Sequence, residues 1–195
     1  MDKKTPTDRE LILQLQGGSL EALGELYDRY QSMVYRTALV ITNDPSSAED
    51  LLQDVFLRLH RFADHVDSQR PIEPWLYRMT TNLAYTYVKR SRRWLGPLED
   101  FAEWLVGNEK QNPHENAEYN DDWQQVQKAI SSLALPQRLV VVLYYLNDLS
   151  LQEISDILDV PVGTVKSRLH YGRETLKKKL GLRSDLLRDL NHESP

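Results

Sequence analysis

The sequence predicts an all-α protein of two small helical domains joined by an acidic linker. Apolar residues recur every three to four positions along most of the 195-residue chain, which favours helices over strands. Ser, Thr, Pro and Gly stand where such helices would begin and end. Residues 94–122 differ in composition, because this segment contains eight acidic residues and only one lysine. We interpret this segment as a flexible linker between the domains.

Composition excludes several classes of protein. Lys plus Arg total 24 and Asp plus Glu total 29, so the net charge of −5 argues against a uniformly basic nucleic-acid coat. The chain has no Cys, which excludes disulfides, thiolate nucleophiles and Cys-ligated metals. Its start lacks the apolar stretch of a signal peptide, and its longest apolar run, Leu139–Leu146, is too short to cross a bilayer. We expect a soluble, cytoplasmic protein without membrane insertion.

The first domain is predicted to span residues 1–93. Thr7 is expected to cap a short helix that ends at Gly17-Gly18, and Ser19 to cap a longer one that ends near Ile41. Ser46, with Glu49 three residues later, has the spacing of a capping box and opens a third helix. A polar loop over 63–73 leads to a fourth helix from about Pro74 to Arg93.

The second domain is predicted to span residues 123–183, with a tail over 184–195. An amphipathic helix is expected over Trp123–Leu133. The segment from Pro136 to Leu146 is β-prone in composition, and local propensity alone would make it a strand. A capping box of Ser150 and Glu153 opens a short helix to Leu158, and a last helix runs from about Val162 to a stop at Gly181.

The last two helices have the pattern of a DNA-binding helix-turn-helix. A short capped helix, a tight turn and a second amphipathic helix would place the outer face of the second helix in a groove. Seven cations against one acid give residues 161–183 a charge of +6 in a protein whose total is −5. A solvated lysine-rich helix without a ligand is the alternative, which the coincidence of capping, turn and early hydroxyls disfavours. The candidate DNA-binding residues are Thr164, Lys166, Ser167, Arg168, His170, Tyr171, Arg173 and Lys177.

The fourth helix of the first domain carries a second candidate surface. One stripe, Leu76, Met79, Leu83 and Tyr87, is expected to face the core. The opposite stripe combines rings, an amide and cations, which suit stacking on unpaired bases and contact with phosphates. Burial of the two aromatic rings, Trp75 and Tyr85, in a core or interface is the alternative and stays open. The candidate residues are Trp75, Arg78, Asn82, Tyr85, Lys89, Arg90, Arg92 and Arg93.

Nothing in the sequence indicates an enzyme. The five His residues form no metal-binding helical motif, and no Gly-rich phosphate loop is present. We therefore expect no catalytic residue, no metal and no cofactor. The acidic face of the third helix has the charge placement of an ordinary solvated helix.

Three segments resemble bacterial RNA polymerase sigma factors of the extracytoplasmic-function (ECF) type. They are Glu49–Phe56, Trp75–Ala84 and Pro161–His170, and the likeness extends over about residues 8–93 and 123–181. The resemblance implies that the first domain binds the polymerase clamp and opens the minus-ten element, while the second reads the minus-thirty-five element. It also implies that Leu139–Leu146 is helical. The residues that it assigns to clamp binding are Asp50, Gln53, Asp54, Leu57 and Arg58.

The implied partners are core RNA polymerase, through its clamp helices and flap, and promoter DNA. An anti-sigma factor is left open, with Trp94, Phe101, Trp104 and the tail as candidate contacts. The implied function is transcription initiation at a specific, stress-related set of promoters. Tyr171-Gly172 departs from the Arg-Ala of many family members, which bears on base preference. A stand-alone regulator that uses only the helix-turn-helix is the competing hypothesis.

Overall fold

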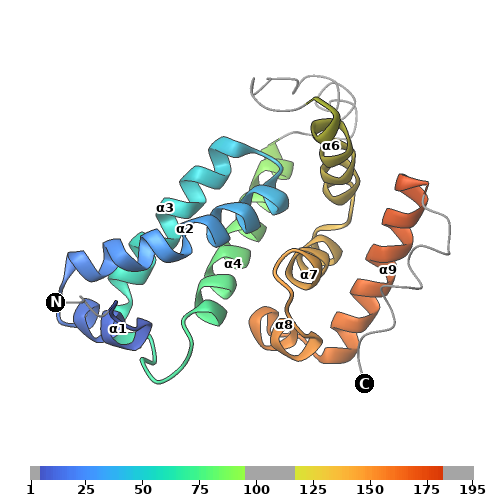
Figure 1. Ribbon diagram of the computed structural model, residues 1–195. Coiled ribbons are helices and arrows are strands. Elements are labelled where there is room, and N and C mark those ends of the chain that lie inside the picture. Colours follow the sequence, from blue (N-terminus) through green and yellow to red (C-terminus); the bar gives the residue numbers. More distant parts are fainter. Residues whose placement is uncertain (1–4, 95–116, 182–195) are drawn as a thin grey trace.

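The computed structural model describes residues 5–94 and 117–181, and every regular element in these ranges is helical (Figure 1). The first domain contains α1 (Asp8–Gln16), α2 (Leu20–Thr42), α3 (Pro45–Arg61), the 3-10 turn η1 (Ala63–His65) and α4 (Glu73–Trp94). The second contains α6 (Ala117–Ser131), α7 (Leu135–Tyr145), α8 (Leu151–Leu158) and α9 (Val162–Leu180). The all-α prediction is confirmed. Most of the predicted acidic linker, with Phe101 and Trp104, and the tail lie outside the described residues. Residues 117–122 were predicted as linker but are helical, so α6 begins six residues before the predicted start at Trp123.

Two of the three helix caps predicted for the first domain are confirmed. The side chain of Thr7 caps α1 in a capping box with Glu10, and Ser19 caps α2. The third start is two residues earlier than predicted, because Asp44 rather than Ser46 is the cap of α3. Asp44 accepts from the backbone N–H of Ser47 at 2.9 Å, and Pro45 occupies the first helical position, where its missing N–H costs nothing.

The first domain is a bundle in which α2 packs against α1, α3 and α4 (Figure 1). Its core gathers fully buried side chains from all four helices, including Leu11, Leu26, Leu59 and Leu76. The loop before α4 is tied down by Gln16, whose Nε2 donates to the carbonyls of Ala63 and Val66 at 3.0 and 2.9 Å. These bonds connect the end of α1 to the first part of the segment between α3 and α4.

Helix α7 shows burial overriding local propensity. Val140, Val141 and Leu143 face a cluster formed with α8 and α9, whereas Leu139 and Val142 face the first domain. The helix is therefore apolar on nearly all sides, which explains its continuous apolar run. The helical assignment implied by the family resemblance is confirmed, and the strand favoured by composition is not formed.

The helix-turn-helix is present as predicted. Helix α8 begins with the capping box of Ser150 and Glu153, and Asp159 ends it in the left-handed conformation, with φ of 52°. Ile154 of α8 packs with Val165 and Leu169 of α9 in one buried cluster. Helix α9 ends at Gly181, which adopts the left-handed conformation with φ of 61°. Opposite the buried side, α9 is free to present an outer face.

The two domains pack against each other rather than standing apart. Ala84 and Val88 of α4 share a buried cluster with Leu135 and Leu139 of α7. Tyr77, also of α4, is buried among residues of α7, α8 and α9. Within the described residues, no helix is both long and apolar enough to span a membrane.

Candidate nucleic-acid interfaces

The outer face of α9 is a polar, cationic surface. Lys166, Ser167, His170 and Tyr171 are all exposed, and the Tyr171 ring is 60% accessible. Val165, on the same helix, is fully buried, which fixes the orientation of the helix and keeps these side chains outward. Helix α9 contains six Lys and Arg residues and a single acidic residue, Glu174, so its net charge is +5. Such a surface can contact phosphates and base edges of a duplex.

The first turn of α9 adds to this surface. Pro161 precedes the helix and provides no side-chain cap. Its carbonyl accepts from the N–H groups of Thr164 and Val165, which leaves the amides of Val162 and Gly163 for an external acceptor. A helix N-terminus with available amides favours a phosphate. Thr164 lies half-buried in this turn, and its carbonyl accepts from the Ser167 hydroxyl at 2.9 Å.

Three other predicted residues of α9 lie away from the centre of this face. The Arg173 guanidinium donates to the Tyr145 hydroxyl at 2.6 Å and lies 5.3 Å from the centroid of the Tyr144 ring. Arg168 and Lys177 are half-buried. The structure thus brings together Lys166, Ser167, His170 and Tyr171, and it directs Arg173 toward the end of α7.

Gly172 has a packing role that its sequence neighbours do not reveal. It is buried, and a Cβ atom added there would lie 2.7 Å from Cγ2 of Val141 in α7. The absence of a side chain therefore lets α9 approach α7 closely. Gly172 thus allows α9 to pack closely on α7, while the Tyr171 side chain is exposed to solvent.

The predicted outer stripe of α4 is largely exposed. Arg78, Asn82, Tyr85 and Lys89 share one face at helical spacing, and Lys89 Nζ lies 5.8 Å from the Tyr85 ring centroid. Arg90 is also exposed, whereas the side chains of Arg92 and Arg93 lie outside the described residues. Trp75 is half-buried against the core of the first domain. The alternative of burial thus holds in part for Trp75 but not for Tyr85.

The inward stripe predicted for α4 is wrong at one position. Tyr87 is 41% exposed, and Tyr77 and Val88 are buried instead. The reason is that α4 buries two sides, one against α2 and α3 and the other against the second domain. Spacing alone identified only the first of these sides.

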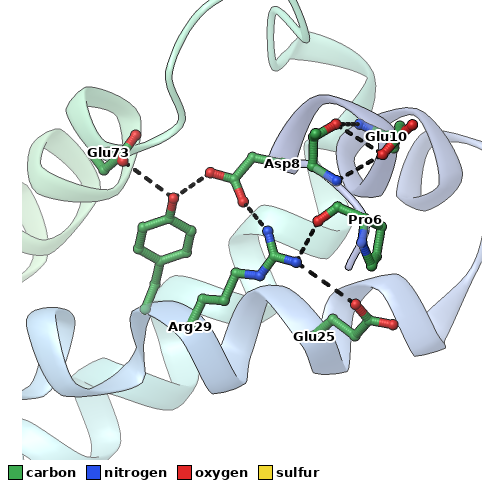
Figure 2. Close-up of polar contacts among 8 residues, drawn as sticks. Pro6, Asp8, Glu10, Glu25, Arg29 and Glu73 are labelled. Atoms are coloured by element: carbon green, nitrogen blue, oxygen red, sulfur yellow. Dashed lines mark hydrogen bonds and ion pairs between the residues drawn. The ribbon is translucent and has the colours of Figure 1, made fainter. Parts of the chain in front are cut away.

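A polar cluster holds the base of α4 (Figure 2). The Tyr30 hydroxyl lies between two carboxylates, hydrogen-bonded to Asp8 and, at 3.2 Å, to Oε1 of Glu73, the first residue of α4. Arg29 pairs with Asp8 at 2.6 Å. Burial, assisted by the hydrogen bond to Asp8, raises the pKa of Tyr30, so the hydroxyl keeps its single proton. This cluster connects α1 and α2 to the start of the candidate surface on α4.

Helix α3 exposes the residues that the family resemblance assigns to polymerase binding. Asp50, Gln53, Asp54 and Arg58 are exposed beside Leu57, whose apolar side chain is 64% accessible. The opposite face, including Val55 and Leu59, is fully buried. One exposed leucine is ordinary on a protein surface, so the assignment of this face to polymerase binding rests on the family resemblance.

Among the described residues, no group of three or more His, Asp or Glu side chains is arranged to hold a metal ion.

Comparison with known proteins agrees with this arrangement. The Sigma-70 region 2 family model matches residues 26–94, and the Sigma-70 region 4 model matches residues 123–176. The ECF RNA polymerase sigma factor SigW of Bacillus subtilis (strain 168) is 31% identical over 88% of this chain and 96% of its own length. The ECF RNA polymerase sigma-E factor of Escherichia coli (strain K12) is 33% identical over 89% and 94%. The chain belongs to the ECF family of RNA polymerase sigma factors. Its function is therefore that of a promoter-directing sigma factor in transcription initiation.

Solved structures of sigma factors share the fold. CnrH, in complex with the cytosolic domain of CnrY, superposes with a TM-score of 0.66 at 22% identity and covers 89% of this chain and 97% of its own. RpoE of Bartonella quintana, in complex with the anti-sigma factor NepR, gives 0.67 at 21% identity over 84% and 99%. This sigma factor thus has the expected helical architecture across both domains.

Sequence reasoning missed the residues that join the two domains of this sigma factor. Arg138 is 3% exposed and donates through Nη1 to the Ile41 carbonyl at 2.6 Å. Asn147 donates to the Thr37 hydroxyl at 3.0 Å. Burial raises the pKa of Tyr77, and a hydrogen bond with the Asn147 side chain partly offsets that rise. No local signal marks these residues, since their partners lie far away along the chain.

Proposed function

We propose that α9 reads the minus-thirty-five element of a promoter and that α4 recognises and opens the minus-ten element. The observation that carries this proposal is the placement of Lys166, Ser167, His170 and Tyr171 on one exposed face of a helix-turn-helix. The N-terminal half of a recognition helix is the part that reaches base edges in this motif. The exposed stripe of α4 offers rings and cations to separated strands.

The partners follow from the same surfaces. Core RNA polymerase binds the exposed face of α3 through its clamp, with Leu57 as the apolar anchor, and its flap contacts the second domain. The chain works in the cytoplasm, contributes no catalytic chemistry and serves a stress-related set of promoters. An anti-sigma factor, such as the partner of the Bartonella sigma factor, would hold it inactive.

The acidic total charge has a role in this function. A net charge of −5 disfavours indiscriminate binding of the free subunit to DNA, because the anionic remainder of the molecule repels phosphates. Specificity then rests on the assembled holoenzyme.

Run-off transcription tests the proposal. Core polymerase with this sigma factor should transcribe promoters recovered from randomised DNA by selection with the holoenzyme, and core polymerase alone should not. Co-purification with core polymerase separates a sigma factor from a stand-alone regulator. Active core and folded protein that never yield a transcript would contradict the proposed function.

Paired charge variants test the α9 surface. Lys166→Ala should weaken binding to minus-thirty-five duplex and reduce its salt dependence by about one phosphate contact. Lys128→Ala, an exposed cation of α6 outside the proposed surfaces, changes the net charge equally and should leave binding unchanged. Arg168→Ala should cost about 1–3 kcal/mol with altered base preference if Arg168 reads a base. An equal loss on every sequence would assign it to phosphate.

A further inference from the structure

The segment between η1 and α4 is held at its start by the last residue of α1. Gln16 donates from Nε2 to the carbonyls of Ala63 and Val66 at 3.0 and 2.9 Å. A side-chain amide has two N–H groups, so both donors of Gln16 are used here. The Ala63 carbonyl also accepts from the Val66 N–H at 2.9 Å. Gln16 therefore binds this turn from outside and orients two of its carbonyl groups.

The same segment is held at its end through the first residue of α1. The Tyr30 hydroxyl is hydrogen-bonded to Asp8 and, at 3.2 Å, to Oε1 of Glu73, where α4 begins (Figure 2). Arg29 donates to Asp8 at 2.6 Å, so the Asp8 carboxylate is itself held in place. The two ends of α1 are thus connected to the two ends of the 66–73 loop.

Helix α1 is a firm base for these contacts. Three of its side chains are at most 3% exposed in the core of the first domain: Leu11, Ile12 and Leu15. A helix of nine residues extends only about 13 Å. The chain from Val66 to Glu73 could extend about 25 Å. The loop therefore contains more chain than the length of α1, and the excess forms an exposed tip.

The tip of the loop is organised by Asp67. Its Oδ1 accepts from the Gln69 N–H at 2.9 Å, its carbonyl accepts from the Arg70 N–H at 3.1 Å, and its carboxylate lies 3.2 Å from Nε of Arg70. Val66 and Ile72, on either side of this tip, are buried. Apolar burial has no preferred direction, so it keeps the loop near the core without orienting the tip. Hydrogen bonds are directional, and those connected to α1 lie at both ends of the loop.

We propose that α1 is a positioning element for minus-ten recognition, and that Gln16 and Asp8 act through the 66–73 loop. The inference rests on the proposed role of α4 in reading this element. By holding both ends of the loop, α1 sets the place of the tip relative to the exposed stripe of α4, which starts at Arg78. A tip held in one position distinguishes one unpaired base from another, whereas a mobile tip must first be ordered by the strand that it binds. Release of either end therefore reduces base discrimination more than contact with the phosphate backbone.

Charge-matched variants of two glutamines test the first end of the loop. Gln16→Glu keeps the size of the side chain but turns carboxylate oxygens toward two carbonyl oxygens, so both hydrogen bonds are lost. Gln14→Glu makes the same change at an exposed position of the same helix. The holoenzyme binds promoter DNA whose minus-ten strand is unpaired, and affinity for the selected sequence is compared with affinity for each single-base change. Gln16→Glu should reduce the largest of these ratios about fivefold, and Gln14→Glu should leave it unchanged.

A donor-retaining variant separates positioning from general stability. The lysine ammonium of Gln16→Lys donates to carbonyl oxygens, so this variant should keep the base discrimination of the natural protein. Binding of minus-thirty-five duplex should be equal in all of these variants, because α1 packs mainly against α2 and η1 rather than against the second domain. A Gln16→Glu protein that is less stable but discriminates bases normally would show that Gln16 only stabilises the fold, and would overturn the proposal.

A spin label on the tip measures its order directly. The chain has no native Cys, so Gln69→Cys provides a single labelling site at an exposed position, and the backbone N–H that binds Asp67 is kept. In the free, full-length protein, Gln16→Glu and Tyr30→Phe should each raise the mobile fraction of the electron paramagnetic resonance spectrum about twofold or more, since each releases one end of the loop. Gln14→Glu should not change the spectrum.

The variant that combines Gln16→Glu with Tyr30→Phe tests whether the two ends act as one device. Release of one end already frees the tip, so the combined change should add little to either single change. Effects that simply multiply would indicate two independent contacts and would overturn the joint role of α1. Equal base discrimination by Gln16→Glu and Gln14→Glu would overturn the positioning role itself. A natural holoenzyme that prefers no minus-ten sequence would instead refute the proposed role of α4.

Discussion

The two candidate DNA surfaces differ in how far other helices cover them. Helix α9 buries Val165 and Leu169 within its own domain, so its outer face is free. Helix α4 buries one side in its own domain and another against the second domain, and Arg78 at the edge of its stripe is engaged by α8. In this structure the surface proposed for duplex DNA is therefore exposed, and the surface proposed for unpaired strands is partly covered by the second domain.

This difference suits the order of events in initiation. Duplex DNA exists before strands separate, so a surface for duplex can be permanently exposed. A surface for unpaired strands is useful only once the strands have separated, so partial cover by the second domain is compatible with its proposed role. The following substitutions act on one surface at a time.

Gly172→Ala should have the largest effect, and it should act on the α9 surface. The new Cβ would lie 2.7 Å from Val141 Cγ2, which is a branched and buried side chain that cannot easily move. We expect a loss of about 3 kcal/mol in the free energy of unfolding, measured by chemical denaturation, as for other overpacked cores. Duplex binding should weaken with it. In the double variant with Val141→Ala, the two losses should fall short of additivity by about 1 kcal/mol or more, and strict additivity would show that this contact is unimportant.

Tyr85→Ala should act on the α4 surface alone. Its exposed ring beside Lys89 is suited to base stacking, so strand opening should weaken by about 2 kcal/mol, near the middle of the range for one stacked base. A fluorescent base analogue in the minus-ten region reports opening. Tyr87→Ala is the matched control, because Tyr87 is similarly exposed on the same helix but lies off the stripe. Equal defects in both variants would remove the stacking role of Tyr85.

Sequence patterns predicted features whose determinants are close together in the chain. The cap at Thr7, the capping box at Ser150, the stop at Gly181 and the helix-turn-helix all depend on residues within one or two turns. The cap at Asp44 was missed because two polar residues competed for one position, and only the backbone geometry distinguishes them.

Long-range polar contacts could not be predicted in this way. Arg138 and Ile41 are 97 residues apart, and Asn147 and Thr37 are 110 apart. A buried arginine satisfied by carbonyl groups has no sequence signature, since the chemistry of the partner is the same at every residue. Helical spacing groups Tyr30 with the apolar residues Leu23, Leu26 and Tyr27, although its hydroxyl binds two carboxylates. Consequently the sequence predicts the two surfaces but not the contact between the two domains that carry them.

Tyr30→Phe should have a smaller effect at the base of α4. The substitution keeps the ring but removes the donor shared by Asp8 and Glu73, and Oε2 of Glu73 is already buried without a hydrogen-bond partner among the described residues. We expect a loss of about 1 kcal/mol in the free energy of unfolding, with slower strand opening. Adding Glu73→Gln to the Tyr30→Phe variant should recover part of that loss by removing one of two like charges.

The control for this variant lies one turn earlier on the same helix. Tyr27 packs edge-on against Phe56 with ring centroids 4.9 Å apart, so Tyr27→Phe keeps its main contact. Its stability and strand opening should stay near those of the natural protein. A Tyr30→Phe protein that opens strands at the natural rate would show that this cluster stabilises the fold without positioning α4.

The smallest expected effect concerns Glu153 in α8, the helix between the two surfaces. Hydrogen bonds from the Ser150 side chain and backbone hold the pKa of the Glu153 carboxyl below its usual value. A carboxyl with a depressed pKa in the folded state stabilises the protein above its unfolded pKa, and that contribution disappears as pH falls through the folded value. Because Glu153 is exposed, Glu153→Gln should cost only about 0.3 kcal/mol at about pH 7. The difference in unfolding free energy between the two proteins should vanish at a pH low enough to protonate the carboxyl, which lies below the usual pKa of a glutamate. If the difference persisted unchanged at that pH, it would have to come from the geometry of the amide rather than from the charge of the cap.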